Sequence, residues 1–198
     1  MRILVVGASG VLGNAVVAAL AGHEIIEASR NGQRRVDLKE PASIAELYAG
    51  SGELDAVACA AGVTPFRPFA ELALEDYRAG LEDKLLGQIE LVRQGVGHVR
   101  DGGSFTLVSG ILSAEPIETG TVASTVNGGV DAFVRAASTG LPRGQRINSI
   151  SANAFVETWD DYAEFFPGFT PVPVADVGRA FARSVLGVQT GQVYRVGY

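Results

Sequence analysis

The segment RILVVGASGVLG, residues 2–13, decides the fold because it joins an apolar run to three regularly spaced glycines. The run 2–7 is rich in β-branched residues, as is typical of a strand that is buried on both faces. Gly7, Gly10 and Gly13 then follow the pattern G-x-x-G-x-x-G ahead of an apolar pattern at helical spacing. Glycine allows a tight turn and lets backbone amides approach a pyrophosphate, which the positive end of a helix attracts. The segment therefore predicts a dinucleotide-binding turn, although tight strand–helix turns also use glycine for packing alone.

Outward from this segment, short apolar runs alternate with longer helical patterns. Such alternation is typical of βαβ units, which form a parallel sheet with helices on both faces. We expect a single doubly wound α/β domain over residues 1–198, a Rossmann fold with about seven strands in the order 3-2-1-4-5-6-7. The expected strands are 2–7, 23–29, 34–38, 53–62, 104–110, 146–151 and 191–197. The expected helices are 11–20, 41–48, 71–99, 121–138 and 175–186.

The stretch 154–174 is the only long irregular piece of the pattern, and such pieces in compact domains are usually functional. We expect it to form a lid over the substrate. An apolar lid surface would come from its aromatic side chains Trp159, Tyr162, Phe165, Phe166 and Phe169. The alternative is that these rings pack on a neighbouring subunit.

Composition excludes several classes of partner. The chain has a formal net charge of −6 and a pI of about 4.9, so we expect no nucleic-acid partner and no anionic membrane surface. No apolar run approaches the ~20 residues of a membrane span and no signal-peptide pattern is present, which predicts a cytoplasmic protein. Cys59 is the only cysteine and is expected to be a small buried side chain. No cluster has metal-ligand spacing, and His23 and His98 are expected at the surface.

The end of the second expected strand bears on the choice of cofactor. A carboxylate there would bind a ribose 2′-hydroxyl, whereas an arginine would accept a 2′-phosphate. The strand ends in Ser29 and Arg30, and Glu27 is turned to a different face by strand alternation. This favours NADP over NAD. The alternative is that Arg30 is a solvated turn residue.

In this order, the motifs resemble those of the short-chain dehydrogenase/reductase family over nearly the whole chain. CAAG (59–62) resembles the family's N-N-A-G segment, ISANAFVET (150–158) its S-P-G-x-x-x-T loop and TGQVYRV (190–196) its closing strand, and Asp37 stands where the family places an acid against the adenine. The resemblance implies that the Val156 backbone and the Thr158 hydroxyl meet the nicotinamide amide. The expected cofactor-binding residues are Gly7, Ser9, Gly10, Val11, Leu12, Gly13, Ser29, Arg30, Asp37, Leu38, Ala60, Ala61, Gly62, Val156 and Thr158.

The family's catalytic residues, by contrast, are missing from the positions where the resemblance places them. The family uses a Ser, a Tyr and a Lys, with an Asn on the preceding long helix. Those four positions fall here on Gly110, Ala123, Asn127 and Lys84. Of the five tyrosines, only Tyr162 in the irregular stretch is placed to reach the site.

An exchange of two residue types between family positions leaves catalysis possible. The chain has two lysines against fourteen arginines, and Lys84 occupies the Asn position while Asn127 occupies the Lys position. An ammonium in a partly desolvated pocket has a lowered pKa and can donate a proton near neutrality. We therefore expect a proton relay of Lys84, Asn127, Ser109 and Ser113. The alternatives are that Lys84 is a solvated helix residue and that the serines only make turn and capping hydrogen bonds.

Two functions from different classes follow. The first is an NADP-dependent oxidoreductase that acts on a small carbonyl or alcohol through this altered relay. The second is a catalytically inactive NAD(P)-binding sensor or partner-binding protein. The resemblance further implies a homodimer or homotetramer that pairs through the two long helices, about 71–99 and 121–139.

Overall fold

The computed structural model describes residues 1–198 and contains one parallel sheet of six strands in the order β2-β1-β3-β4-β5-β6. The doubly wound Rossmann fold predicted from the sequence is confirmed. β1 lies between β2 and β3 and has helices over both faces, so all but one of its residues are buried, as its continuous apolar run predicts. The strands are β1 (Arg2–Val6), β2 (Glu24–Ala28), β3 (Leu54–Cys59), β4 (Val99–Val108), β5 (Arg146–Ala152) and β6 (Val193–Val196).

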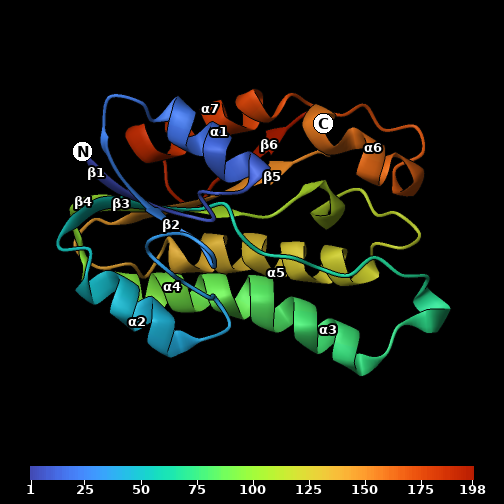
Figure 1. Cartoon of the computed structure of the whole chain (residues 1–198), viewed down its shortest axis with the longest axis horizontal. Helices are drawn as coiled ribbons and strands as arrows, with labels where there is room; N and C mark the ends of the chain where they lie inside the picture. Colours follow the sequence, from blue (N-terminus) through green and yellow to red (C-terminus); the bar gives the residue numbers. More distant parts are fainter.

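Helices cover both faces of the sheet, as Figure 1 shows. One face carries α1 (Val11–Ala19) and α7 (Val174–Leu186), and the other carries α2 (Pro41–Ala49), α3 (Leu74–Gly80), α4 (Gly87–Gly95) and α5 (Thr121–Ala137). Each face has its own apolar core. Val16, Leu20 and Phe181 belong to the core under α1 and α7, whereas Tyr48 and Leu91 belong to the core on the other face. None of the helices combines the length and the apolar character that a membrane span requires.

The segment 34–38, expected as a strand, pairs with the sheet only through an isolated bridge between Ser29 and Arg35. Its sheet-like hydrogen bonds run from Ser29 N to Arg34 O and from Val36 N to Ser29 O, at 3.1 and 3.2 Å. Only Val36 and Leu38 of the segment are buried. Because the exposed arginines contribute no buried area here, the pairing stops after one residue and β2 remains the edge strand.

Within the long helical pattern predicted at 71–99, residues 74–95 form one continuous helix with an irregular centre, and Val99 already begins β4. A π-helical turn, η2 (Leu81–Leu86), joins α3 to α4 without a break. Such turns carry one wider hydrogen-bonded loop and occur frequently at functional sites. Here the π-helical turn contains Lys84, which is buried under the carboxyl end of the sheet.

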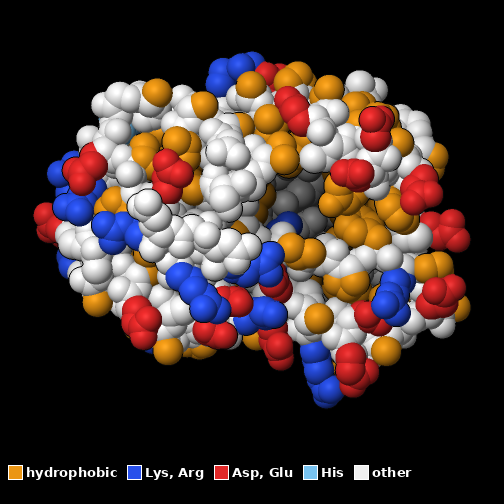
Figure 2. Space-filling model, viewed as in Figure 1, with side chains coloured by type: hydrophobic (Ala, Val, Ile, Leu, Met, Phe, Trp, Pro, Cys, Tyr) orange, Lys and Arg blue, Asp and Glu red, His pale blue; other side chains and the backbone are white.

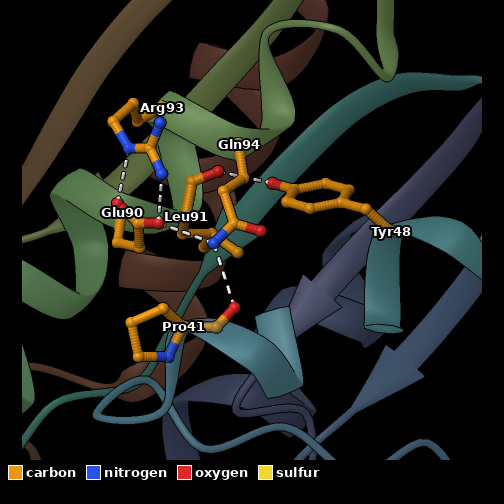
Figure 3. A network of polar contacts seen from close by, with 6 residues as sticks. All are labelled: Pro41, Tyr48, Glu90, Leu91, Arg93 and Gln94. Atoms are coloured by element: carbon orange, nitrogen blue, oxygen red, sulfur yellow. Dashed lines mark hydrogen bonds and ion pairs between the residues drawn. The ribbon is translucent and has the colours of Figure 1, made fainter. Parts of the chain in front are cut away.

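A network of polar contacts joins α2 to α4 (Figure 3). The hydroxyl of Tyr48 donates to the Leu91 carbonyl at 2.7 Å, and Gln94 Nε2 donates to the Pro41 carbonyl at 3.0 Å. The same Gln94 amide also donates to Glu90 Oε1 at 2.6 Å. These bonds fix the position of α4, which continues the helix that carries Lys84.

The stretch 154–174 contains short turns and one short helix, α6 (Trp159–Tyr162). Its Phe166 belongs to a separate apolar cluster with Ile111, Leu112 and Ala123, beyond the end of the sheet. The stretch therefore stands next to the start of α5. Figure 1 shows α6 on the side of the molecule that also holds the C-terminus.

Candidate functional site

The first glycines hold the turn between β1 and α1 in a conformation that side chains would block. Gly7 has a φ of +84°, and a Cβ there would lie 2.9 Å from backbone atoms of Ala60. A Cβ on Gly13 would lie 2.0 Å from the Gly7 carbonyl oxygen. Gly7 N also donates to Ala28 O at 2.8 Å, which ties the turn to β2. The glycines thus allow the close approach of α1 to the turn.

The N-terminus of α1 is open to an anion. Its N-cap residue is Gly10, and no side chain caps the first turn. Helix amides there have no intrahelical partner and lie at the positive end of the helix dipole. Gly10, Val11 and Leu12 also line cavities of the structure. This arrangement fits a pyrophosphate group.

A first cavity of about 300 Å³ opens beside this turn, along the carboxyl ends of β1, β2 and β3. Ligands of open α/β sheets bind at this edge. Most of the cofactor-binding residues predicted from the sequence line it, namely Gly7, Ser9, Gly10, Ser29, Arg30, Asp37, Leu38, Ala60, Ala61 and Gly62. Sequence reasoning missed Val6, Asn31, Val36, Val63 and Asp83, which line it as well.

Polar side chains of the first cavity come from the end of β2, from the segment 34–38 and from the long helix. Arg30 is exposed, whereas Ser29 is buried. Asp37 Oδ1 accepts a hydrogen bond from the Lys39 amide at 3.0 Å, which orients the carboxylate. Asp83, a residue that the sequence analysis missed, accepts from the Val63 amide at 2.8 Å and fixes the loop after β3.

A second cavity of about 360 Å³ adjoins the first, since Gly10, Ala60, Gly62 and Val63 line both. The face of the molecule drawn in Figure 2 has a hollow, and hydrophobic side chains gather along part of its rim. Among the predicted residues, the second cavity is lined by Val11, Leu12, Lys84, Asn127 and Thr158. Thirteen of its 21 lining residues are hydrophobic, so most of its wall suits an apolar group.

Lys84 occupies the polar end of the second cavity. The side chain is 8% exposed, and its Nζ donates to the Ser109 carbonyl oxygen at 3.0 Å. Its stem packs on Gly62, where an added Cβ would come within 2.5 Å of the Lys84 Cγ. The prediction that Lys84 points into the cleft near Ser109 matches this geometry. It is not the solvated helix residue of the alternative interpretation.

The environment of Lys84 changes its acidity. Burial lowers the pKa of Lys84 to about 8, because the charged form loses hydration. The charges of Asp131 and Asp83 offset part of this effect. A lysine with a pKa near 8 is mostly protonated at neutral pH and readily gives up its proton, as a general acid requires.

The positions of the family's usual Ser, Tyr and Lys lie in the same cavity as Lys84. Gly110, Ala123 and Asn127 all line the second cavity. Asn127 fills space that a serine side chain would need, since a Cβ on Gly110 would lie 2.9 Å from Asn127 Nδ2. The Oδ1 of Asn127 is buried and has no hydrogen-bond partner. Buried polar atoms normally have one, so this orphan acceptor can take a hydrogen bond from a donor group of a ligand.

Four predicted residues take no part in lining either cavity. The Ser109 side chain is buried with an unpartnered hydroxyl, although its carbonyl accepts from Lys84. Ser113 lies in the turn after β4, where its amide donates to Gly110 O. Gly13 acts through packing, and Val156 is 51% exposed. Whether they bind a cofactor or substrate stays a prediction.

Aromatic rings close the outer side of the second cavity. Phe66, from the loop after β3, contacts Tyr162 and Phe166 with ring centroids 6.1 and 6.3 Å apart, and all three line the cavity. Phe66 therefore bridges that loop and the stretch 154–174. The sequence analysis missed Phe66, which stands outside every motif, although a lone aromatic between two prolines was a signal of an ordered loop.

The residues present do not form a metal site or a reactive cysteine. No group of three or more His, Cys, Asp or Glu side chains is placed to hold a metal ion. Cys59 is fully buried, and burial raises the pKa of its thiol to about 12, so it carries no thiolate at neutral pH. The arrangement can bind a dinucleotide and deliver a proton from Lys84.

Comparison with known proteins gives the following matches. Residues 13–183 match the sequence model of the family described as enoyl-(acyl carrier protein) reductase. The protein lin1944 from Listeria innocua is 44% identical, with a TM-score of 0.97 over 99% of both chains. A small-chain dehydrogenase in complex with NADPH is 21% identical, with a TM-score of 0.88 over 99% of this chain and 96% of that one. A short-chain dehydrogenase/reductase from Serratia marcescens is 18% identical, with a TM-score of 0.82 over 98% and 94%. The last two likenesses show the fold alone, and no curated protein matches the sequence.

Proposed function

The chain belongs to the short-chain dehydrogenase/reductase family, and from this premise we propose that it is an NADP(H)-dependent oxidoreductase acting on a small carbonyl or alcohol. The cofactor would lie across the two adjoining cavities. Its pyrophosphate would meet the turn at Gly7 and Gly10 and the N-terminus of α1, while Asp37 would face the adenine. When bound, NADPH supplies the hydride.

Preference for the phosphorylated cofactor rests on the charge at the end of β2. Arg30 lines the first cavity and can pair with a 2′-phosphate, whereas Glu27, the carboxylate nearest the end of β2, does not line this cavity. A structural relative in complex with NADPH has the same fold, which is consistent with this choice.

The proton would come from Lys84, and the burial of its ammonium in the second cavity is the observation that carries the proposal. The substrate oxygen would accept from Lys84 Nζ, with the Asn127 amide beside it. The bond from Nζ to the Ser109 carbonyl holds the ammonium in place. The aromatic rings of Phe66, Tyr162 and Phe166 would exclude water from the reacting carbonyl.

Two measurements test this function together. NADPH and NADH are titrated into the parent protein, and NADPH oxidation is followed against a broad panel of aldehydes and ketones. Gly13→Val serves as the control, because a side chain there would collide with the Gly7 carbonyl and displace α1 from the turn. We expect tight NADPH binding in the parent only, with turnover of at least one carbonyl. A folded Gly13→Val protein that binds NADPH as tightly as the parent would refute the cofactor site.

A catalytically inactive sensor is the second candidate. It is favoured by one observation, the alanine at position 123, because no hydroxyl stands where the family places its tyrosine. The two functions separate experimentally, since a sensor would bind NADPH but oxidise none of it with any member of the panel.

We further propose a homodimer or homotetramer that pairs through the helix formed by α3, η2 and α4, and through α5. Leu86 on this long helix is 52% exposed, and Gly128 on α5 leaves open space where a Cβ would stand. Small and apolar residues of this kind allow close contact between helices of two copies.

A further inference from the structure

The second cavity ends in a buried ammonium that no carboxylate neutralises. Lys84 Nζ makes one hydrogen bond, to the Ser109 carbonyl, and takes part in no ion pair of the structure. Buried charges in proteins are normally paired, since an uncompensated charge loses its hydration. A ligand with a negative charge could therefore pair with this ammonium.

The acidic residues near Lys84 are engaged elsewhere. Asp83, on the same helix, accepts from the Val63 amide at 2.8 Å. Asp131, on α5, accepts from the Ser149 hydroxyl at 2.8 Å. Each influences Lys84 through its charge, but neither is within ion-pair distance of Nζ.

The donor count of the ammonium indicates which anion fits. An ammonium has three N–H donors, and one of them is used by the Ser109 carbonyl. Two remain for a ligand. A 2-oxo acid carries a ketone oxygen and a carboxylate oxygen on adjacent carbons, so a single ammonium can contact both. Asn127, which is 4% exposed and lines the same cavity, places a further amide beside them.

The other walls of the cavity are suited to an apolar side chain. Phe66, Phe155, Tyr162 and Phe166 line it together with Leu112. Pockets of this composition bury an apolar group while a few polar groups fix its orientation. An aromatic ring also gains from edge or offset contacts with such rings.

We infer that the substrate is a 2-oxo acid with an apolar, preferably aromatic, side chain, whose carboxylate pairs with the ammonium of Lys84; this inference rests on the proposed function. In the reduction, a hydride is added to the ketone carbon and a proton to its oxygen. One 2-oxo acid, one NADPH and one proton give one 2-hydroxy acid and one NADP⁺. Lys84 gives its proton to the new alkoxide and is reprotonated from solvent.

Binding is measured without turnover by using the single tryptophan. Trp159 lies in α6 and packs against the cluster that contains Phe166, a residue of the cavity wall, so we expect its fluorescence to change when the cavity is filled. The probes are mandelate, a 2-hydroxy acid, and mandelamide, its uncharged isostere. We expect mandelate to bind about 10- to 100-fold more tightly than mandelamide, the range for a charge-assisted hydrogen bond. Lys84→Met should remove this preference, whereas Lys39→Met, at the only other lysine and an exposed one, should keep it.

A pH series on the parent protein provides a second measurement that needs no variant. The groups facing Lys84 are Asp83 of its own helix, Asp131 of α5 and Cys59 of β3. The thiol of Cys59, with a pKa raised to about 12, stays neutral throughout pH 6–9. Lys84 changes charge in this window, since its pKa is about 8. Mandelate affinity should therefore fall as pH rises through 8, and mandelamide affinity should not.

The outcomes separate this inference from the proposed function. Equal binding of mandelate and mandelamide in the parent, at every pH, would overturn the inference, and reduction of uncharged ketones would still support an NADPH-dependent reductase. Selective mandelate binding with no reduction of benzoylformate would leave the anion site standing and contradict the proposed reaction. Faster reduction of benzoylformate than of its methyl ester, with the preference lost in Lys84→Met, would support both.

Discussion

At the scale of single residues, the burial of Lys84 costs hydration energy and also lowers the pKa of its ammonium. An ammonium that is 8% exposed loses hydration, and its only hydrogen-bond partner is a neutral carbonyl. The same loss lowers its pKa to about 8, which is the range in which a lysine both holds and releases a proton at physiological pH. The residue thus fits the role of an acid in a site without the family's tyrosine.

The first prediction concerns this acid. Lys84→Met keeps the apolar stem and removes the charge, so we expect a folded protein whose turnover is lower by about 10²-fold or more, the usual loss with a general acid. In the parent, turnover in the reductive direction should fall as pH rises through about 8, because the donor is then deprotonated. A steady-state pH profile of both proteins checks this. Unchanged turnover in Lys84→Met would remove the residue from the mechanism.

The second prediction concerns cofactor choice at Arg30. Arg30→Ala should weaken NADPH binding by roughly 1.5–3 kcal/mol, as expected for loss of a charge-assisted hydrogen bond. NADH, which lacks the 2′-phosphate, should bind nearly as before. Calorimetric titration of both nucleotides into both proteins measures the difference. Tighter binding of NADH than of NADPH by the parent would shift the assignment to Glu27.

Residues whose type itself determines the backbone conformation were predictable from the sequence. Residues whose role depends on contacts with distant parts of the chain were not. Gly7 indicates a turn because few other residues tolerate its φ of +84°, and both Gly7 and Gly10 line the first cavity. Phe66 gave no comparable signal, since its role depends on contacts with Tyr162 and Phe166, which lie about a hundred residues away in the chain. Long-range packing of this kind has no local pattern.

At the scale of elements, the helix that carries Lys84 is held by α2 as well as by the sheet. Figure 3 shows the contact of Tyr48 with the Leu91 carbonyl, one turn before Gly95. A Cβ on Gly95 would lie 2.4 Å from the Tyr48 hydroxyl oxygen and 2.7 Å from a ring atom of Phe105. The two helices therefore approach closely because residue 95 has no side chain.

The third prediction is a double-mutant cycle at this contact. Gly95→Ala should lower the free energy of unfolding by about 1–3 kcal/mol, the usual cost of overpacking. Tyr48→Phe alone should cost about 1 kcal/mol through the lost hydrogen bond. Because Tyr48→Phe also removes the oxygen that the added methyl group would contact, the two changes together should cost less than their sum. Urea unfolding of the four proteins measures the coupling, and strict additivity would contradict the proposed contact.

The sequence predicted the elements with strong periodicity and missed those set by their neighbours. The apolar runs of β1 and β3 are long and uninterrupted, so they identify buried strands. The segment 34–38 shows a shorter apolar pattern, and its exposed arginines leave it a single bridge beside β2. The π-helical turn in the long helix was equally out of reach, because one widened turn does not change the apolar pattern of the sequence.

At the scale of the whole molecule, the fold gathers residues from distant elements at one edge of the sheet. The turn after β1, the loop after β3, the long helix and the stretch 154–174 all contribute to two adjoining cavities. Their volumes of about 300 and 360 Å³ together lie within the range of small-molecule sites. A parallel sheet produces this arrangement, since all its strands end at the same edge.

The fourth prediction concerns assembly of the protein. Pairing through the long helix and α5 predicts a homodimer or homotetramer in solution, which light scattering coupled to size-exclusion chromatography measures directly. Leu86→Arg places a charge on the exposed face of the long helix and should shift the population towards the monomer. Leu186→Arg, at a comparably exposed position on α7, is the matched control and should leave the mass unchanged. A monomeric parent protein would refute this assembly.

The central claim is that one cleft both holds NADPH and reduces a carbonyl beside Lys84. Transfer of deuterium from NADPH labelled at the reactive carbon tests it most directly, because the product itself records the origin of the hydrogen. With benzoylformate and a panel of uncharged aldehydes and ketones, we expect mass spectrometry to find deuterium on the alcohol carbon of at least one product. The parent protein should give at least about 10² times more labelled alcohol than Lys84→Met. NADPH bound tightly by the parent, with no deuterium in any product, would contradict the claim and identify a nucleotide sensor instead.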